Sequence, residues 1–418
     1  MKVSLHLLLV VFLLTVTSAC HVGRFFVRNY ANITDERVFP YDEIATGSPK
    51  SVLPQAASAY GLDTLKLRTD KWEHNLSGYL DRRTSTVGFV VLQQDSIVFE
   101  EYYDGYGASS TSMIFSVSKS ITSLSCGIAV DDGYIESVDD PVVKYLPEFA
   151  DGHPYWKELT IRQCLDMRSG LDYKESYSNP FSDMAKLYYG TNSTAQLKKL
   201  DFVAKPGTLH DYQSGTTSII GLVVERATGQ PLAEYLSEKV WIPMGMEYPA
   251  TFSLDDKEHR IAKAYCGINA TARDLAKIGM LYSNQGRFNG KQIVSEQWVE
   301  ASITPDAEND LYQYQWYSPT VLLRDDTGAP RIFEDSLAAL MAIETESLSN
   351  SKVYPSKGKY VVKYTSGAFY AQGILNQFIY VDPESDIVIV RQGKKWDDGY
   401  LWLFDSIVAK VKATKLKR

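Results

Sequence analysis

The stretch from Met113 to Ser120 is MIFSVSKS, and it places Ser116 and Lys119 three residues apart. Apolar residues then recur at helical spacing, at positions 117, 121, 124 and 128. A helix turns by about 100° per residue, so Ser116 and Lys119 share a side of it that is not the apolar stripe. A lysine buried against a serine is costly unless it has a chemical task. The stretch indicates a nucleophile beside its base, and a helix start with a surface lysine is the simpler alternative.

The same S-x-x-K spacing occurs twice more, at Ser349/Lys352 and at Ser356/Lys359. Both pairs lie in the polar run SNSKVYPSKGK, whose Pro and Gly are typical of an exposed loop. Neither pair precedes an apolar helical stripe. The pair Ser116/Lys119 is therefore the candidate for chemistry, and the other two are predicted to be surface residues.

The composition is that of a globular protein of 418 residues, with 44% hydrophobic and 22% charged side chains. This length fits one large domain or two interleaved ones. The net charge of −8 indicates no basic face for nucleic acid. His and Cys are scattered, so neither a metal nor another cofactor is predicted. Cys126, Cys164 and Cys266 form no C-x-x-C pair and are predicted to be small buried residues.

The first nineteen residues are predicted to be a signal peptide, because Lys2 precedes an apolar run, Leu7 to Val16, that is too short to span a bilayer comfortably. The next stretch, TSAC, ends at Cys20 and resembles the lipobox of bacterial lipoproteins, with Thr17 where Leu is usual. That resemblance implies lipidation of Cys20, and ordinary cleavage after Ala19 is the alternative. Both predict export to the bacterial periplasm or cell envelope, with a membrane anchor if Cys20 is modified.

The chain is expected to comprise a lead-in segment over 20–60 and a main domain over 61–412, with a mainly helical region at about 133–285 and an insertion at about 318–363. Helices are predicted at Thr64–Arg82 and Tyr400–Val411, and another within the insertion at 334–348. Hairpins are predicted from Val87–Leu92 with Ile97–Tyr103, and from Phe378–Val381 with Ile387–Arg391. Strands at both ends of the chain, with helices between, predict an α/β (α+β) fold: an antiparallel sheet flanked by helices, with an inserted helical region.

Three further stretches accompany the S-x-x-K pair: LDMRSGL at 165–171, HDYQSG at 210–215 and FYAQGILNQFIYVDP at 369–383. In this order they resemble the serine β-lactamase and penicillin-binding-protein superfamily, and its class C branch in particular, from about residue 85 to 410. The resemblance implies a β-lactamase/transpeptidase-like fold. The second motif is YQS where Tyr-x-Asn is usual, and the third is AQG where Lys-Thr-Gly is usual. These departures are closer to the 6-aminohexanoate-dimer hydrolase and related esterases of the superfamily.

The resemblance also implies roles for individual residues. Ser116 would be the nucleophile, with Lys119 and Tyr212 as proton-transfer groups, and which of the two is the formal base is left open. Backbone N–H groups of Ser116 and of Ile374, the latter after Gly373 on an edge strand, would form the oxyanion hole. The substrate would also contact Ser214, Gln372 and Gly373. Singly, these residues have plainer interpretations as a rim aromatic, a helix N-cap or a bulge.

The sequence thus predicts an exported serine hydrolase that cleaves a small-molecule ester or linear amide through an acyl-enzyme. One alternative is a penicillin-recognising enzyme, either a β-lactamase or a D-amino-acid peptidase. Another is a catalytically silent binding lipoprotein of the same fold. Five aromatic residues could line the cleft or belong to the core, and they are Tyr173, Tyr188, Tyr189, Tyr314 and Trp316. The insertion could form a lid or merely decorate the surface.

Overall fold

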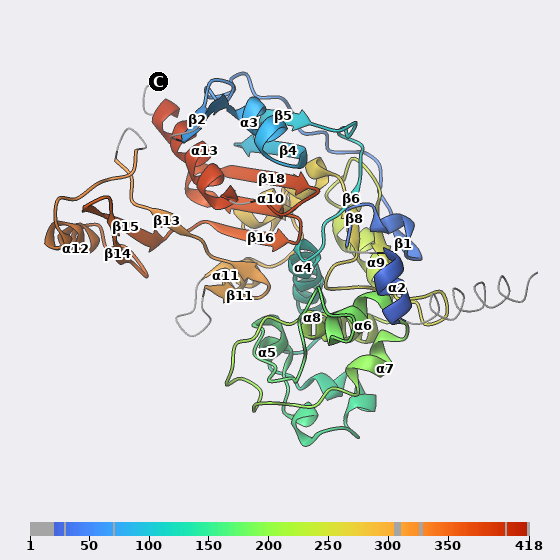
Figure 1. Ribbon diagram of the computed structural model, residues 1–418. Helices are drawn as coiled ribbons and strands as arrows, with labels where there is room; N and C mark the ends of the chain where they lie inside the picture. The colour runs from blue at the N-terminus through green and yellow to red at the C-terminus, as the bar shows by residue number, and fades with distance from the viewer. Residues whose placement is uncertain are drawn as a thin grey trace, which may run out of the picture. The chain divides into compact units, whose positions relative to one another are not determined.

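The computed structural model describes residues 21–28, 31–69, 72–304, 311–325, 329–397 and 399–415 (Figure 1). The chain divides into two compact units, each assembled from separate segments. Unit 1 takes its described residues from Met1–Thr46, Ser112–Pro243 and Pro249–Asn269. Unit 2 takes them from Gly47–Thr111, Met244–Tyr248 and Ala270–Arg418. The predicted α/β class, with antiparallel sheets flanked by helices, is confirmed.

Unit 2 is built on a seven-stranded antiparallel sheet with the strand order β11-β12-β16-β17-β18-β4-β5. In that order the strands span Tyr312–Gln313, Trp316–Tyr317, Phe369–Gly373, Gln377–Asp382, Ile387–Gly393, Thr86–Gln93 and Ser96–Tyr102. Both predicted hairpins are confirmed, as β4 with β5 and as β17 with β18. The pairing of β18 with β4 joins strands from opposite ends of the chain.

Helices cover both faces of this sheet, so its central strands β17, β18 and β4 are buried on both sides. Phe378 and Tyr380 of β17 pack on Phe404 of α13 (Tyr400–Lys415), which includes the predicted final helix. The alternate residues of β17 and β18 face α10 (Ala272–Ser283). At Gly279 a Cβ atom would lie 2.5 Å from Val388 Cγ1, closer than such atoms approach. Glycine there lets α10 lie directly on the sheet.

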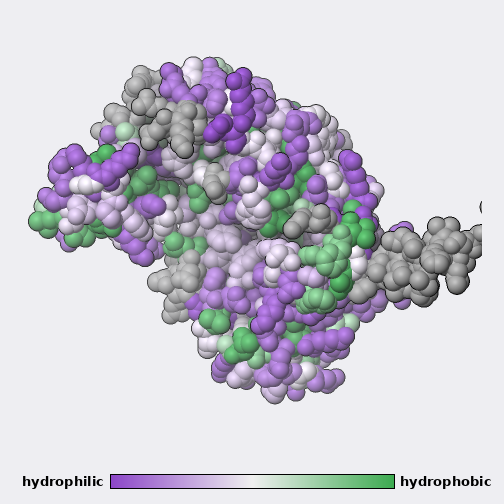
Figure 2. Space-filling view, in the orientation of Figure 1, coloured by the Kyte–Doolittle hydropathy of each residue, from purple (hydrophilic) through white to green (hydrophobic). Residues whose placement is uncertain are grey.

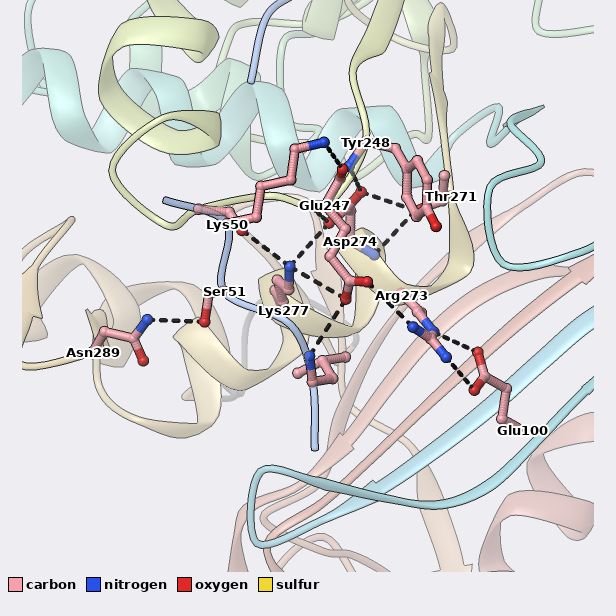
Figure 3. A network of polar contacts seen from close by, with 12 residues as sticks. Lys50, Ser51, Glu100, Glu247, Tyr248, Thr271, Arg273, Asp274, Lys277 and Asn289 are labelled. Carbon is pink, nitrogen blue, oxygen red and sulfur yellow. Dashed lines mark hydrogen bonds and ion pairs between the residues drawn. The ribbon is translucent and has the colours of Figure 1, made fainter. Parts of the chain in front are cut away.

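A buried polar network fixes the first turn of α10 (Figure 3). The carboxylate of Asp274 accepts hydrogen bonds from the backbone N–H groups of Glu247 (2.7 Å) and Tyr248 (3.0 Å). It also accepts from Thr271 Oγ1 at 2.9 Å and from Lys277 Nζ at 3.2 Å. Asp274 and Lys277 are both buried, so each charge depends on the other for compensation.

The same network extends from α10 to the sheet through Arg273. Its Nη1 donates to Glu247 Oε2 at 3.2 Å, and its Nε donates to Glu100 Oε1 of β5 at 2.6 Å. The Arg273 guanidinium helps to hold the pKa of the Glu100 carboxyl below its ordinary value, against the opposing effect of burial. The segment 47–53 joins as well, because the Leu53 N–H donates to Glu247 Oε1. Segments far apart in sequence are thereby tied together within unit 2.

Unit 1 is mainly helical, with a four-stranded sheet of order β1-β7-β8-β6. Its two long helices, α4 (Val117–Asp131) and α8 (Ser214–Thr228), pack against each other. The shorter helices are α2 (His21–Arg28), α5 (Ile161–Leu165), α6 (Asp183–Tyr189), α7 (Ser193–Leu197) and α9 (Leu232–Leu236). The strands are β1 (Tyr41–Ile44), β7 (Ala250–Ser253), β8 (Ile268–Ala270) and β6 (Ser112–Met113). The predicted Ser116 helix is confirmed as α4.

The predicted lead-in segment is more than a linker, because it holds regular elements of unit 1. Helix α2 packs against α6, and β1 pairs with β7 in antiparallel register from Tyr41–Ser253 to Ile44–Ala250. The predicted signal peptide and Cys20 lie outside the described residues. Within the part of the chain that the structure describes, every helix falls short of the length and apolarity needed to cross a membrane.

The helix predicted over Thr64–Arg82 is wrong in its first half. Residues 66–75 form an antiparallel hairpin of β2 (Lys66–Thr69) and β3 (Trp72–Asn75), and α3 begins only at Leu76 and ends at Arg83. Asn75 sets this boundary, because its side chain accepts a hydrogen bond from the Gly78 N–H at 3.0 Å, as a helix N-cap does.

The loop predicted for SNSKVYPSKGK is also wrong, although the surface position predicted for its two serine–lysine pairs is confirmed, since Ser349, Lys352, Ser356 and Lys359 are all exposed. The middle of this run forms β14 (Lys352–Ser356), which pairs with β15 (Lys359–Thr365) across a two-residue turn. Lys357 and Gly358 in that turn have φ of 51° and 78°, as tight hairpin turns require. β13 (Thr320–Leu322) and α12 (Ser336–Thr345) complete a small body, and α12 confirms the helix predicted in the insertion. Its core comprises Leu323, Phe333, Ala339, Ala342 and Val362.

The outer side of α12 is apolar. Leu337, Leu340 and Met341 are 67%, 50% and 59% exposed, and Figure 2 shows green surface at the α12 end of the molecule. These spacings place the three side chains on one side of the helix. The insertion therefore buries one side of α12 on its own sheet and presents the other to solvent.

We predict that Asp274→Ala destabilises the protein by about 3–5 kcal/mol, because Lys277 and two backbone N–H groups would lose their buried acceptor. The urea midpoint of unfolding measures this effect. Glu384→Ala is the matched control, since Glu384 pairs with Lys412 while 82% exposed and should change stability by less than about 0.5 kcal/mol. Equally small shifts of the urea midpoint in both variants would show that the network does not stabilise the fold to the proposed extent.

Candidate active site

Ser116 occupies the N-cap position of α4 and is half-buried. The residue before it, Phe115, has φ of 47°, an unusual conformation for a bulky buried side chain. Ile268 holds this turn from two sides: its carbonyl accepts from the Ile114 N–H at 3.0 Å, and its N–H donates to Ser118 Oγ at 3.1 Å. The Ser116 N–H precedes the first helical turn, so the helix itself does not use it.

Lys119 lies one turn into α4 and is fully buried. Its Nζ donates to Ser116 Oγ at 3.0 Å, to Ser214 Oγ at 3.1 Å and to the carbonyl oxygen of Tyr265 at 3.2 Å. Burial lowers the pKa of Lys119 to about 8, and the charge of Glu175 opposes that shift. All three partners are uncharged, so they satisfy the amine geometrically without strongly favouring its protonated form.

Tyr212 and Ser214 reach the same lysine from the start of α8. The ring centroid of Tyr212 lies 4.8 Å from Lys119 Nζ, and that of Tyr265 lies 5.8 Å away. Gln213 occupies the N-cap position, so Ser214 is the first helical residue rather than the cap. Unit 1 thus brings together Ser116, Lys119, Tyr212 and Ser214, four residues that the sequence singled out.

Gln213, between the two motif residues, ties the second motif to the stretch LDMRSGL. Its side chain is buried, accepts from Ser169 Oγ at 3.0 Å and donates to the Leu171 carbonyl at 2.9 Å. Gly170 between them has φ of 72°, and a Cβ there would lie 2.3 Å from the Ala204 carbonyl oxygen. The SGL turn therefore holds the backbone that carries Tyr212, and glycine is required within it.

Glu175 is a residue of this cluster that the sequence analysis missed. Its carboxylate accepts from the Ser214 backbone N–H and from Ser214 Oγ, both at 2.8 Å, and from the Tyr177 hydroxyl at 2.7 Å. Glu175 lies in an irregular stretch, YKESYSNP, that carries no helical or strand periodicity. Its position depends on a tertiary contact, which no local pattern could have indicated.

The third motif lies in unit 2, on β16. This strand is not outermost, because β12 pairs with it at Tyr317–Tyr370, but Ala371 through Gly373 pair with β17. Ala371 and Gly373 are buried, whereas Gln372 and Ile374 are half-buried. That Ser116 and Ile374 donate to one oxyanion stays a prediction, as does substrate contact by Gln372 and Gly373.

Arg391 of β18 holds the turn that follows Ile374. Leu375 and Asn376 in this turn have φ of 61° and 60°, and the Arg391 Nη1 donates to their carbonyl oxygens at 3.1 Å and 2.7 Å. The guanidinium is fully buried, and its carbon atom lies 4.0 Å from the ring centroid of Tyr400. Arg391 thereby fixes the backbone next to the predicted second oxyanion donor.

The five aromatic residues considered for the cleft are all buried, at 1–7% exposure, which supports the core interpretation. Cys126, Cys164 and Cys266 are buried free cysteines, as predicted. Among the described residues, no three or more His, Cys, Asp or Glu side chains are grouped to hold a metal ion. The cluster places a serine hydroxyl beside a desolvated amine.

Comparison with known proteins places this chain in a family. The Beta-lactamase family model matches residues 69–398, and the chain belongs to that family, whose members are serine hydrolases. The predicted membership of the serine β-lactamase and penicillin-binding-protein superfamily is thereby confirmed.

The individual relatives match the chain at low sequence identity and over only part of its length. The chain is 29% identical over 252 residues to the 6-aminohexanoate-dimer hydrolase of Paenarthrobacter ureafaciens, which covers 58% of this chain and 62% of that one. It is 26% identical over 237 residues to a Salmonella agona protein assigned as a D-alanyl-D-alanine carboxypeptidase, covering 50% of each. The matched regions thus span 62% and 50% of the length of these two curated relatives, less than two thirds of each.

The fold is shared over nearly the whole chain with one solved structure. A Bacillus anthracis protein assigned as a 6-aminohexanoate-dimer hydrolase superposes with a TM-score of 0.72 and 22% identity. The superposition covers 96% of this chain and 97% of the other. At this identity the likeness shows the fold alone.

Proposed function

We propose that the chain hydrolyses a small ester or linear amide through an acyl-enzyme on Ser116. The observation that carries this proposal is the buried amine of Lys119, 3.0 Å from Ser116 Oγ. A serine hydroxyl becomes nucleophilic when a base takes its proton, and a lysine serves as that base once burial has made its neutral form accessible. With the pKa of Lys119 lowered to about 8, a useful fraction of the amine is neutral near pH 7.

In the proposed reaction, Ser116 Oγ bonds to the acyl carbon while its proton passes to Lys119 or Tyr212. The Ser116 N–H, at a helix N-terminus, stabilises the developing oxyanion, and the family motif assigns the second donor to Ile374. Collapse of the intermediate breaks the bond to the alcohol or amine, which leaves with a proton from the Lys119/Tyr212 pair. Water then attacks the acyl-enzyme by the reverse route and releases the acid.

The ester or linear amide is proposed over a β-lactam because the third motif begins with Ala371. Penicillin-recognising relatives of the superfamily carry a cation there that meets the substrate carboxylate. A charge-assisted hydrogen bond is worth about 1.5–3 kcal/mol, or one to two orders of magnitude in rate. The relative named 6-aminohexanoate-dimer hydrolase supports amide cleavage. The relative assigned as a D-alanyl-D-alanine carboxypeptidase favours a D-amino-acid peptidase as the second candidate.

Ser116→Ala is expected to abolish covalent labelling by a fluorophosphonate and turnover of p-nitrophenyl butyrate while leaving the fold intact, since the change removes a hydroxyl but little volume. Mass spectrometry of the labelled protein, circular dichroism and initial rates measure these outcomes. Wild-type rates in the variant would show that Ser116 is not the nucleophile. For the wild type, efficient cephalosporin turnover with negligible esterase activity would favour the second candidate instead.

We further predict a pH dependence from the buried lysine. If neutral Lys119 is the base, kcat/KM should rise about tenfold per pH unit below pH 8 and level off above it, because only the deprotonated amine accepts the proton. Rates from pH 5.5 to 9.5 measure this acid limb. Lys119→Arg is the control, since a guanidinium does not deprotonate in this range and should leave almost no activity. A wild-type profile that is flat from pH 6 to 9 would contradict the assignment.

We also propose that the protein is exported and anchored by a lipid on Cys20, on the strength of TSAC after the apolar run. Expressed in a bacterium, Cys20→Ser is expected to move the protein from the membrane fraction to the soluble periplasmic fraction. Fractionation with immunoblotting measures the distribution, and Cys126→Ser, a change at a buried cysteine, is the control. Unchanged membrane partitioning of Cys20→Ser would rule out this anchor.

A further inference from the structure

The hydrogen atoms on Lys119 have only a limited choice of acceptors. The Tyr265 carbonyl oxygen, 3.2 Å from Nζ, can accept a hydrogen bond but has no proton to give. Ser214 Oγ, 3.1 Å from Nζ, could in principle either accept or donate. If Ser214 Oγ accepts, one hydrogen of Lys119 points to Ser214 instead of to Ser116. If Ser214 donates, it uses the lone pair of the neutral lysine.

Glu175 settles the direction of that hydroxyl. Its Oε1 lies 2.8 Å from Ser214 Oγ, and an ionised carboxylate can only accept. The Ser214 proton is therefore directed to Glu175, and Ser214 Oγ faces Lys119 with its lone pairs. The second carboxylate oxygen accepts from the Ser214 backbone N–H at 2.8 Å, so the carboxylate is hydrogen-bonded to both the backbone and the side chain of Ser214.

A neutral amine has two hydrogens and one lone pair. With the Tyr265 carbonyl and Ser214 Oγ each accepting one hydrogen, the lone pair is left for the third neighbour, Ser116 Oγ, at 3.0 Å. We propose that Glu175 is a positioning residue that acts through Ser214 to aim the lone pair of Lys119 at the hydroxyl of Ser116. This inference rests on the proposed function, and it assigns Lys119 as the base that takes the Ser116 proton.

The proton balance of this step is simple. The Ser116 Oγ–H bond breaks, its proton forms the third N–H bond of Lys119, and the oxygen electron pair bonds to the acyl carbon of the substrate. Ser214 and Glu175 keep their protonation states throughout. The ammonium that results has three hydrogens for the same three oxygens, so the contacts that orient the base also hold its conjugate acid.

The fold holds Glu175 at this place through its neighbours. Tyr173 is buried against the start of α8, where a Cβ on Gly215 would lie 2.9 Å from its ring. The Lys174 N–H donates to Asp183 Oδ2 at 3.0 Å, and the Tyr177 hydroxyl donates to Glu175 Oε1 at 2.7 Å. The irregular segment therefore approaches Ser214 in a defined conformation.

The test is the near-isosteric variant Glu175→Gln. If its amide oxygen stays with the Ser214 N–H, its NH2 group faces Ser214 Oγ and donates to it, and the Ser214 hydroxyl proton turns towards Lys119. We expect the high-pH plateau of kcat/KM for p-nitrophenyl butyrate to fall by about ten- to a hundredfold, within the range of general-base effects. Because the Glu175 charge raises the pKa of Lys119, its loss should also move the acid limb to lower pH.

A double-mutant comparison separates positioning from a merely structural role. In a Ser214→Ala background, Glu175→Gln should change the plateau by less than about twofold, because the residue through which it acts is gone. The acid limb should still move, because the charge effect does not need Ser214. Asp172→Asn is the matched control on the same segment, since the Asp172 carboxylate forms an ion pair with the exposed Lys174 and the rates of this variant should be unchanged.

Failure of this inference is distinguishable from failure of the proposed function. An active wild type whose Glu175→Gln variant has the same plateau, or loses as much with Ser214→Ala as without it, overturns the positioning role alone. A wild type no faster than Ser116→Ala overturns both. Circular dichroism and the thermal midpoint of each variant ensure that a fall in rate reflects the site and not unfolding.

Discussion

The site depends on one constraint, the removal of the Lys119 amine from water beside a serine hydroxyl. Burying a charged amine is unfavourable, and the protein offsets this with three oxygen partners rather than with an adjacent carboxylate. A second buried lysine, Lys277, illustrates the other solution, because Asp274 lies 3.2 Å from its Nζ. A direct carboxylate partner favours the charged amine and suits a structural lysine, whereas neutral partners keep a lysine available as a base. Glu175 contacts Ser214, and Ser214 in turn contacts Lys119, so Glu175 orients the amine through Ser214 without an ion pair of its own.

The surrounding elements can be understood from that requirement. Helix α4 presents Ser116 and Lys119 one turn apart, and Phe115 adopts a left-handed conformation just before it. Helix α8 must begin beside α4, and the buried side chain of Gln213 anchors its start to the SGL turn. In unit 2, Arg391 performs a comparable task for the turn after β16. In the last two cases a buried polar side chain fixes a backbone segment that periodic structure alone would leave undetermined.

The sequence predicted those parts of the fold that local patterns encode. Apolar runs on either side of turn residues indicated the β4–β5 and β17–β18 hairpins, and the stripe from Val117 to Ile128 indicated α4. It failed where a cap or a turn overrides composition: Asn75 starts α3 late, and Lys357–Gly358 turns a polar run into a hairpin. In the candidate site, motif spacing singled out Ser116, Lys119, Tyr212 and Ser214, which the structure brings together. Glu175 was missed because its proposed role depends on a contact with Ser214, 39 positions away in sequence, and because its own segment has no periodicity.

The register of β18 between β17 and β4 has a consequence for how the chain is made. Residues 387–393 supply the neighbour that covers β4, some three hundred positions after β4 itself has been synthesised. Until then the β4–β5 hairpin exposes a long apolar edge, and unpaired edges of this kind recruit strands from other chains. Contacts so distant in sequence form slowly, since a large loop must close first. The last strand of the chain is thus the one that closes the sheet, and a nascent or truncated copy carries the greatest hazard of association before residue 393 is in place.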